Sequence, residues 1–144
     1  MHGYLEQFAG SKIAVVGDII LDSYLSGDVS RLSPEAPVPI VLCHSERKVP
    51  GGAANVAMNI VSIGGAVKLC GVTGHDEASA TLLSLLKDAQ KIDLTGIVRD
   101  PSRQTTQKLR IIGQNQQGLS QCRAAARTWR RPILFISPNQ TRGL

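Results

Sequence analysis

The clearest periodic pattern in the chain follows a glycine pair, Gly51-Gly52, and predicts an α-helix. Apolar residues recur there at the spacing of a single helix face, at Ala53, Val56, Ala57, Ile60 and Val61. The polar side chains Asn55, Asn59 and Ser62 fall on the opposite face. An apolar stripe of this kind packs on a core. We therefore expect a helix that begins at the glycine pair and lies on a β-sheet.

Short apolar runs on both sides of this helix predict strands. Lys12–Val16 ends at a glycine, and residues 66–72 follow the helix, so together they form a βαβ unit whose first strand we expect to be central. Residues 93–98 are expected to form a third strand. Polar and apolar residues alternate over residues 105–112, which predicts a strand with one exposed face.

A second helix is expected after Asp76. Its core-facing stripe consists of Leu82, Leu83, Leu85, Leu86 and Ala89. Asp76 precedes this stripe at the position of an N-cap, where a carboxylate accepts hydrogen bonds from the first backbone N–H groups. We therefore assign Asp76 and the neighbouring His75 to local structure rather than to chemistry.

Residues 23–50 differ in character from the segments around them. Proline is confined to the edges and starts of strands, so a proline-rich stretch that leads into an apolar run predicts exposed strands outside the main sheet. Such strands would form a flap over a site. Arg31 and Glu35 lie in this segment, and they either face a ligand or are simply solvated. The prolines are Pro34, Pro37 and Pro39, and the apolar run is residues 40–43.

Composition describes a soluble globular chain. Its 144 residues are 42% hydrophobic and 19% charged, enough for one modest domain or for part of a larger one. No apolar run is long enough to span a membrane, so we expect a cytoplasmic protein. The three cysteines are far apart and form no CxxC, which supports reduced thiols and predicts neither disulfides nor a metal site. They are Cys43, Cys70 and Cys122.

The net charge of +5 is confined to the end of the chain. All 11 acidic residues lie within residues 1–117, whereas residues 118–144 carry only basic charges. Five arginines without acids would attract phosphates, so a nucleic-acid-binding protein is the alternative function. Trp129 is the one aromatic residue between Arg123 and Arg131, which gives little support by base stacking and disfavours that alternative. The arginines are Arg123, Arg127, Arg130, Arg131 and Arg142.

Candidate site residues cluster around the first strand and the first helix. Asp22 comes just after the apolar run that follows the first strand, where open α/β sheets bind ligands. Gly51 and Gly52 leave backbone N–H groups uncovered at a helix start, and Asn55 offers a donor and an acceptor one turn later. The plainer interpretation is equally open: Asp22 caps a turn, and the glycines lead into an ordinary core helix.

Two further sequence patterns bear on function. Thr106, Lys108 and Arg110 share one face of their strand and form a polar strip that would meet either a phosphate or only solvent. A dinucleotide-binding oxidoreductase is disfavoured, because no GxGxxG follows the first strand.

Three segments together resemble the ribokinase-type (PfkB) carbohydrate kinases. They are Gly17-Asp18 with Asp22, the flap Ser30-Arg31-Leu32-Ser33-Pro34-Glu35-Ala36-Pro37-Val38-Pro39, and Pro50-Gly51-Gly52-Ala53-Ala54-Asn55-Val56-Ala57. Within that family the flap and Thr105-Thr106-Gln107-Lys108-Leu109-Arg110 are similar to kinases that phosphorylate D-glycero-β-D-manno-heptose 7-phosphate at O1 in ADP-heptose and lipopolysaccharide core synthesis. The resemblance covers roughly residues 8–117.

The resemblance implies an α/β fold, namely the N-terminal part of a ribokinase-like sheet with flanking helices and a small β lid. It assigns Asp22, Gly51, Gly52 and Asn55 to sugar binding and residues 23–45 to the lid, through which family members form homodimers. Arg31, Lys108 and Arg110 are further candidates for contacts with a sugar phosphate. ATP and Mg²⁺ serve the full-length family in phosphoryl transfer.

The chain departs from the family pattern after Gln117. The family's catalytic base is an Asp in a Gly-Ala-Gly-Asp motif, and this sequence has no such motif. A shifted reading frame with an early stop would produce the basic residues 118–144, which we expect to be a disordered tail outside the family domain. The expected molecule is therefore residues 1–117 of a sugar kinase domain that binds no ATP, has no catalytic base and does not turn over alone.

Overall fold

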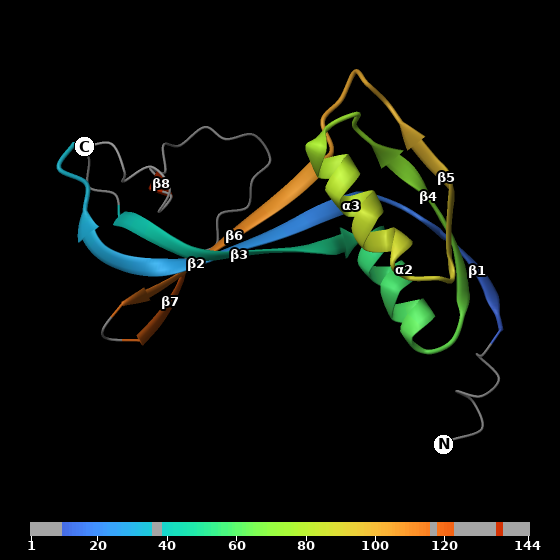
Figure 1. The fold of residues 1–144 in the computed structure, drawn as a ribbon, viewed down its shortest axis with the longest axis horizontal. Helices are drawn as coiled ribbons and strands as arrows, with labels where there is room; N and C mark the ends of the chain where they lie inside the picture. Colours follow the sequence, from blue (N-terminus) through green and yellow to red (C-terminus); the bar gives the residue numbers. More distant parts are fainter. Residues whose placement is uncertain (1–9, 36–38, 116–117, 123–134, 137–144) are drawn as a thin grey trace. The chain divides into compact units, whose positions relative to one another are not determined.

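The structure is a computed structural model that describes residues 10–35, 39–115, 118–122 and 135–136 (Figure 1). The chain divides into two compact units. The first comprises Met1–Asp22 and Val49–Gln107, and the second comprises Ser23–Lys48 and Lys108–Leu144.

The first unit contains a parallel three-stranded sheet in the order β1-β4-β5. Its strands are β1 (Lys12–Val16), β4 (Ala66–Thr73) and β5 (Ile92–Arg99), and all were predicted from the sequence. The expectation that the first strand is central is wrong. β4 pairs with both β1 and β5, so β1 lies at an edge of the described sheet.

Two helices, α2 (Ala53–Ser62) and α3 (Glu77–Lys87), cover one face of this sheet (Figure 1). The core between the layers includes Leu69, Leu82 and Leu86, which have no exposed surface. Side chains of β1 and β5 that point to the same side pack against it. Burying these apolar groups supplies most of the favourable free energy of the unit.

The buried stripe of α2 differs from the predicted one at two positions. Ala54 is fully buried, whereas Val56, placed on the stripe by its spacing, is 47% exposed. The buried residues of the helix are Ala53, Ala54 and Ala57. Small alanines allow the helix axis to approach the sheet closely, and this orientation turns Val56 to the side. The polar Asn55, Asn59 and Ser62 are exposed as predicted.

Asp76 holds the start of α3 and the loop before β6 together. Its Oδ1 accepts hydrogen bonds from the Ser79 backbone N–H at 2.8 Å and from the Thr105 hydroxyl at 2.6 Å, and its Oδ2 accepts one from the Thr105 N–H at 2.7 Å. The Thr105 hydroxyl oxygen in turn accepts from the Gly74 N–H at 2.9 Å. The predicted N-cap is confirmed. It also anchors a loop 29 residues away in sequence.

The second sheet has the order β7-β6-β2-β3-β8. Its long strands are β2 (Ile19–Leu32), β3 (Pro39–Gly52) and β6 (Thr106–Asn115). The predicted flap is therefore formed by long paired strands. Within the second unit, Gly27 lies so close to β3 that a Cβ there would clash with the carbonyl oxygen of Leu42. Ile40, Val41 and Ile111 are buried.

Two short strands lie in the segment for which disorder is predicted. β7 (Gly118–Cys122) pairs antiparallel with β6, and β8 (Phe135–Ile136) pairs parallel with β3 at Val41 and Leu42. The expectation that residues 118–144 form a disordered tail stays a prediction. The rest of residues 118–144 lies outside the described part of the chain. Among the described residues, no helix is both long and apolar enough to cross a membrane.

We predict that Asp76→Ala lowers the free energy of unfolding by about 2 kcal/mol or more. The change removes an N-cap, which contributes about 1 kcal/mol, and leaves the Thr105 N–H without its acceptor. Urea unfolding followed by circular dichroism measures the effect. Asp88→Asn, at an exposed position after the same helix, is the control and should change stability by less than about 0.5 kcal/mol. Equal stability of Asp76→Ala and the parent chain would contradict the assigned role.

The same carboxylate makes stability depend on pH. Burial by itself raises the pKa of Asp76, but hydrogen bonds from Thr105 and Ser79 outweigh it and hold this pKa below its ordinary value of 3.8. A depressed folded pKa stabilises the fold above that ordinary value and loses its effect as pH falls through the folded pKa. The advantage of the parent chain over Asp76→Asn should therefore be full at pH 6 and shrink below about pH 3.8. A constant difference from pH 6 to pH 2 would contradict it.

Candidate functional site

The site predicted around the first helix lies within the first unit, and the structure brings Asp22 and Gly51 together. Gly51 is buried, and a Cβ added to it would lie 2.8 Å from Cγ and 2.9 Å from Oδ2 of Asp22. Only a glycine leaves room for the carboxylate at this distance. Asp22 itself lies within β2 rather than in a loop after β1, because the apolar residues 19–21 already begin a new strand.

Gly52 forms the corner between β3 and α2. Its backbone has φ 57 and ψ −133, a conformation that residues with a Cβ rarely adopt. A Cβ there would clash with the carbonyl oxygen of Asp18 and lie 3.1 Å from Cγ1 of Ile20. The next residue, Ala53, donates its backbone N–H to the same Asp18 carbonyl at 2.9 Å. The glycine pair therefore allows the chain to turn directly against the start of β2.

The N-terminus of α2 carries a partial positive charge that no side chain of its first turn offsets. No side chain caps it, and its first turn carries no acidic residue. The Ala53 N–H is already bonded to the Asp18 carbonyl, so the N–H groups that follow it in the first turn carry the partial positive charge that attracts an oxygen-rich or anionic ligand. Asn55 lies in this first turn with an exposed side chain, so its amide can offer a donor and an acceptor beside the helix start.

Sequence reasoning assigned no role to Asp18 and did not single out Ile20, and both support the glycine corner. Asp18 acts through its backbone carbonyl, and Ile20 acts through its side chain next to Gly52. Neither role has a sequence signal, because any residue supplies a carbonyl and many apolar residues would fill the space beside Gly52.

The predicted phosphate contacts belong to the second unit. The Arg110 guanidinium lies 4.9 Å from the centroid of the Tyr24 ring, and its Nη1 donates to the Tyr24 hydroxyl at 2.7 Å. Arg110 is therefore held by Tyr24, a partner that the sequence did not indicate. Lys108 is exposed, and the side chain of Arg31 lies outside the described residues. Phosphate binding by these three residues stays a prediction.

The remaining sequence predictions concern cysteines, metals and the basic segment. Cys43 and Cys70 are free thiols, and burial, followed by the charge of Glu46, raises the pKa of Cys43. In the described part of the chain, no group of three or more His, Cys, Asp or Glu is placed to hold a metal ion. His75 is exposed. The arginines of residues 123–144 lie outside the described residues, so nucleic-acid binding stays a prediction.

Two of the known proteins that this chain resembles are bifunctional HldE proteins. The chain is 55% identical over 106 residues to the bifunctional protein HldE of Helicobacter pylori strain P12, a match that covers 74% of this chain and 23% of the relative. It is 47% identical over 113 residues to the bifunctional protein HldE of Gluconobacter oxydans, covering 78% of this chain and 24% of the relative. The chain thus spans about a quarter of the length of these relatives.

Solved structures show the same fold. The chain resembles phosphofructokinase-2 from Escherichia coli in complex with fructose-6-phosphate, with a TM-score of 0.58 and 23% identity. That likeness covers 82% of this chain and 35% of the enzyme. The sequence model of the pfkB family carbohydrate kinases matches residues 11–139, which extends past Gln117. This chain therefore belongs to the pfkB family of carbohydrate kinases.

Proposed function

We propose that this chain supplies the sugar-binding part of an ATP-dependent kinase that phosphorylates D-glycero-β-D-manno-heptose 7-phosphate at O1. The observation that carries the proposal is the Asp22 carboxylate placed against Gly51 at an uncapped helix start. The identity of about half of the aligned residues to two bifunctional HldE proteins supports the heptose as the substrate class.

The chemistry of a sugar fits this arrangement. A carboxylate accepts hydrogen bonds from two neighbouring hydroxyls, and charge-assisted bonds of this kind are roughly twice as strong as neutral ones. In this proposal the N–H groups that follow Ala53 at the start of α2 donate to hydroxyl oxygens, and the Asn55 amide can both donate and accept. Asp22, Gly51, Gly52 and Asn55 would therefore hold the sugar and fix its orientation, while none of them acts as a base in the proposed role.

ATP is the second substrate of the proposed reaction, and it supplies the phosphoryl group. Among the described residues no group of three or more metal-ligating side chains comes together, so we assign none of them to the Mg²⁺ that accompanies it. The sequence also lacks the Gly-Ala-Gly-Asp motif that would carry the base. We therefore assign sugar binding to these residues and derive no transfer step from them. A homodimer formed through residues 23–45 stays part of the proposal.

The first test is binding of heptose 7-phosphate to the purified chain, measured by calorimetry. Asp22→Asn removes one charged acceptor, and the loss of about 1.5–3 kcal/mol predicts a Kd at least about tenfold higher. Asp88→Asn, at an exposed position after α3, is the matched control and should leave the Kd unchanged. An unchanged Kd for Asp22→Asn would return this residue to a purely structural role.

Gly51→Ala tests the contact between the glycine pair and the carboxylate. A Cβ at this position would lie 2.8 Å from Asp22 Cγ, so the carboxylate must move and the Kd for heptose 7-phosphate should rise. Gly17→Ala is the control, since its Cβ would meet only the Ala53 Cβ at an ordinary 3.5 Å. Equal affinities of the two variants would show that the position of Asp22 does not matter for binding.

The last test concerns turnover. We expect no phosphorylation of heptose 7-phosphate by the purified chain with ATP and Mg²⁺, measured as ADP release against a sample without protein. The missing motif is the reason. ADP release that depends on the sugar would overturn this prediction while leaving the sugar-binding proposal in place.

A further inference from the structure

The side chain of Tyr24 orients Arg110 in the second unit by two contacts. Nη1 of Arg110 donates a hydrogen bond to the Tyr24 hydroxyl at 2.7 Å, and its guanidinium carbon lies 4.9 Å from the centroid of the Tyr24 ring. Both residues are half-buried, and they come from the neighbouring strands β2 and β6. The ring and its hydroxyl are uncharged, so Tyr24 orients the guanidinium without offsetting its positive charge.

An oriented guanidinium suits a phosphate ester. It is planar, stays charged at any physiological pH, and presents five N–H donors in a fork that matches two phosphate oxygens. Such charge-assisted bonds are roughly twice as strong as neutral ones, and a side chain held in place before the ligand arrives loses less entropy on binding. Lys108, two residues earlier on β6, is exposed and offers a point charge on a flexible stem. Arg110 is therefore the better prepared of these two cations.

The partner of Arg110 belongs to the same strand as the carboxylate proposed for sugar binding. Tyr24 is the second residue after Asp22 along β2. Successive side chains of a strand alternate between its two sides, so Asp22 and Tyr24 leave β2 on the same side. Leu21 and Ser23, which alternate with them, are only 1% and 5% exposed. One side of β2 therefore carries the carboxylate and the ring that holds Arg110.

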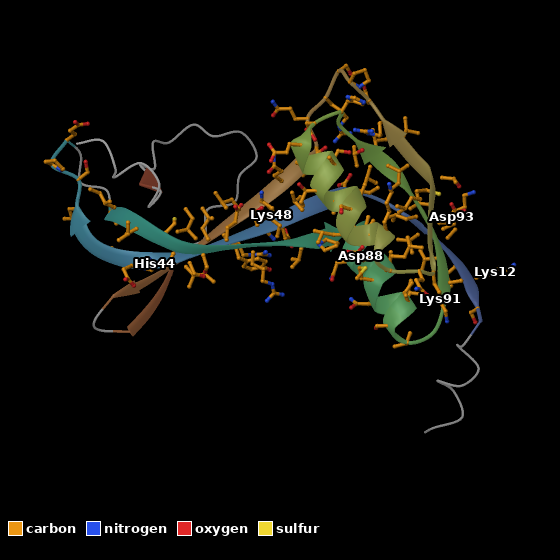
Figure 2. All side chains as sticks on the ribbon, viewed as in Figure 1. Lys12, His44, Lys48, Asp88, Lys91 and Asp93 are labelled. Carbon is orange, nitrogen blue, oxygen red and sulfur yellow. The ribbon has the colours of Figure 1, made fainter. Side chains whose placement is uncertain are left out.

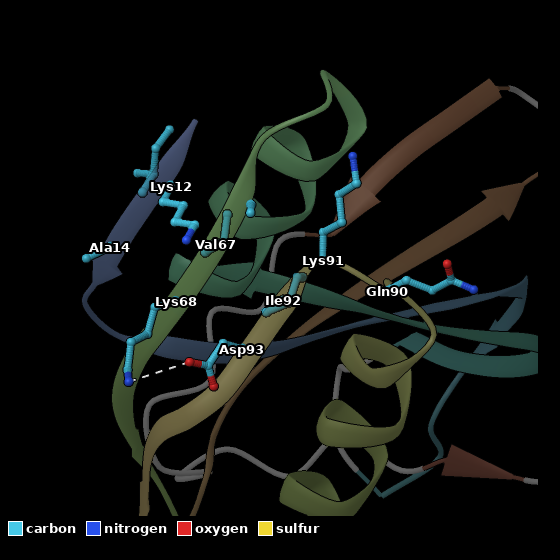
Figure 3. A pocket seen from close by; sticks show the side chains of 10 residues that line it. Lys12, Ala14, Val67, Lys68, Gln90, Lys91, Ile92 and Asp93 are labelled. Carbon is cyan, nitrogen blue, oxygen red and sulfur yellow. Dashed lines mark ion pairs between the residues drawn. The ribbon is translucent and has the colours of Figure 1, made fainter. Parts of the chain in front are cut away.

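A second group of cations lies in the first unit and fits a phosphate ester less well. Lys12, Lys68 and Lys91 are among the residues that line a cavity of about 670 Å³ (Figure 3). Nζ of Lys68 lies 3.5 Å from Oδ2 of Asp93, and Nζ of Lys91 donates to the carbonyl oxygen of Gly64 at 3.3 Å. The cavity lies at the N-terminal ends of β1, β4 and β5, whereas open α/β sheets bind ligands at the carboxyl ends of their strands. We therefore do not assign this cavity to a sugar phosphate.

We propose that Arg110 binds the phosphate ester of the sugar phosphate, and that Tyr24 is a positioning residue that holds the guanidinium for this contact. The inference rests on the proposed function for the identity of the ligand, heptose 7-phosphate. A phosphate monoester carries between one and two negative charges at neutral pH. A site built around an oriented cation loses this partner when the phosphate is missing, so Arg110 determines specificity for the phosphorylated sugar.

The test is calorimetry of the full chain with heptose 7-phosphate and with the same heptose without its phosphate. The parent chain should bind the phosphorylated sugar at least about tenfold more tightly. Arg110→Gln should abolish this preference and leave the Kd for the unphosphorylated heptose unchanged, a pattern that a general loss of structure does not produce. Tyr24→Phe keeps the ring and removes the hydroxyl, so the preference should fall about threefold. An unchanged preference in Arg110→Gln overturns the proposal, and one in Tyr24→Phe overturns the positioning role.

Arg47→Gln is the matched control, because it removes the same charge from the same unit. His44 on β3 (Figure 2) lies 2.7 Å from Oδ2 of Asp28, which leaves β2 on the same side as Tyr24. Arg47 is exposed and stands three residues after His44, so its side chain leaves β3 on the opposite side. The preference for the phosphorylated sugar should therefore be unchanged. A loss equal to that of Arg110→Gln would indicate a general effect of charge and overturn the proposal.

Inorganic phosphate separates failure of this inference from failure of the proposed function. NMR follows the Arg110 Nε–H signal of the full chain as phosphate is added, with chloride at equal ionic strength as the comparison. A shift that saturates with phosphate alone, and is weaker in Tyr24→Phe, supports the contact even if neither sugar binds, an outcome that overturns only the proposed function. No shift, together with equal binding of the two sugars by the parent chain, overturns the inference and leaves sugar binding in place. No shift and no sugar binding overturn both.

Discussion

The Ala53 N–H donates to the carbonyl oxygen of Asp18 over 2.9 Å, and this bond ties the first turn of α2 to the segment that enters β2. Such an approach of two backbones is possible only where the intervening corner lacks a side chain, and Gly52 provides it with a positive φ. The same approach brings Gly51 against the Asp22 carboxylate. The candidate sugar site is therefore a consequence of one backbone contact between segments about 35 residues apart.

A second polar cluster stabilises the far end of the helical layer. Asp76 satisfies N–H groups of α3 and of the loop that leads to β6, and Ser79 and Thr73 bond to each other by their hydroxyls at 3.0 Å below it. Thr73, Ser79 and Thr105 are buried, so their polar groups need these partners. The network is structural, which agrees with assigning Asp76 to local structure.

The two faces of the β1-β4-β5 sheet play different roles. One face is covered by alanines of α2 and by leucines of α3. These side chains form part of the core next to the glycine corner. The other exposes valines at one end and lysines at the other. The chain spans about a quarter of the length of its HldE relatives, and parallel sheets are normally covered on both faces.

The sequence by itself determined the elements of the first unit and the N-cap at Asp76, because hydrophobic period and capping residues act over a few neighbouring positions. It also singled out Asp22, Gly51, Gly52 and Asn55, since glycine pairs and lone carboxylates at strand ends are local signals. Tertiary structure decided the rest. The edge position of β1, the burial of Ala54 in place of Val56, and the strand at residues 118–122 depend on which distant segments pair and pack. The hydrogen bond that Arg110 donates to the Tyr24 hydroxyl joins residues 86 positions apart, and no local pattern encodes a contact at that separation.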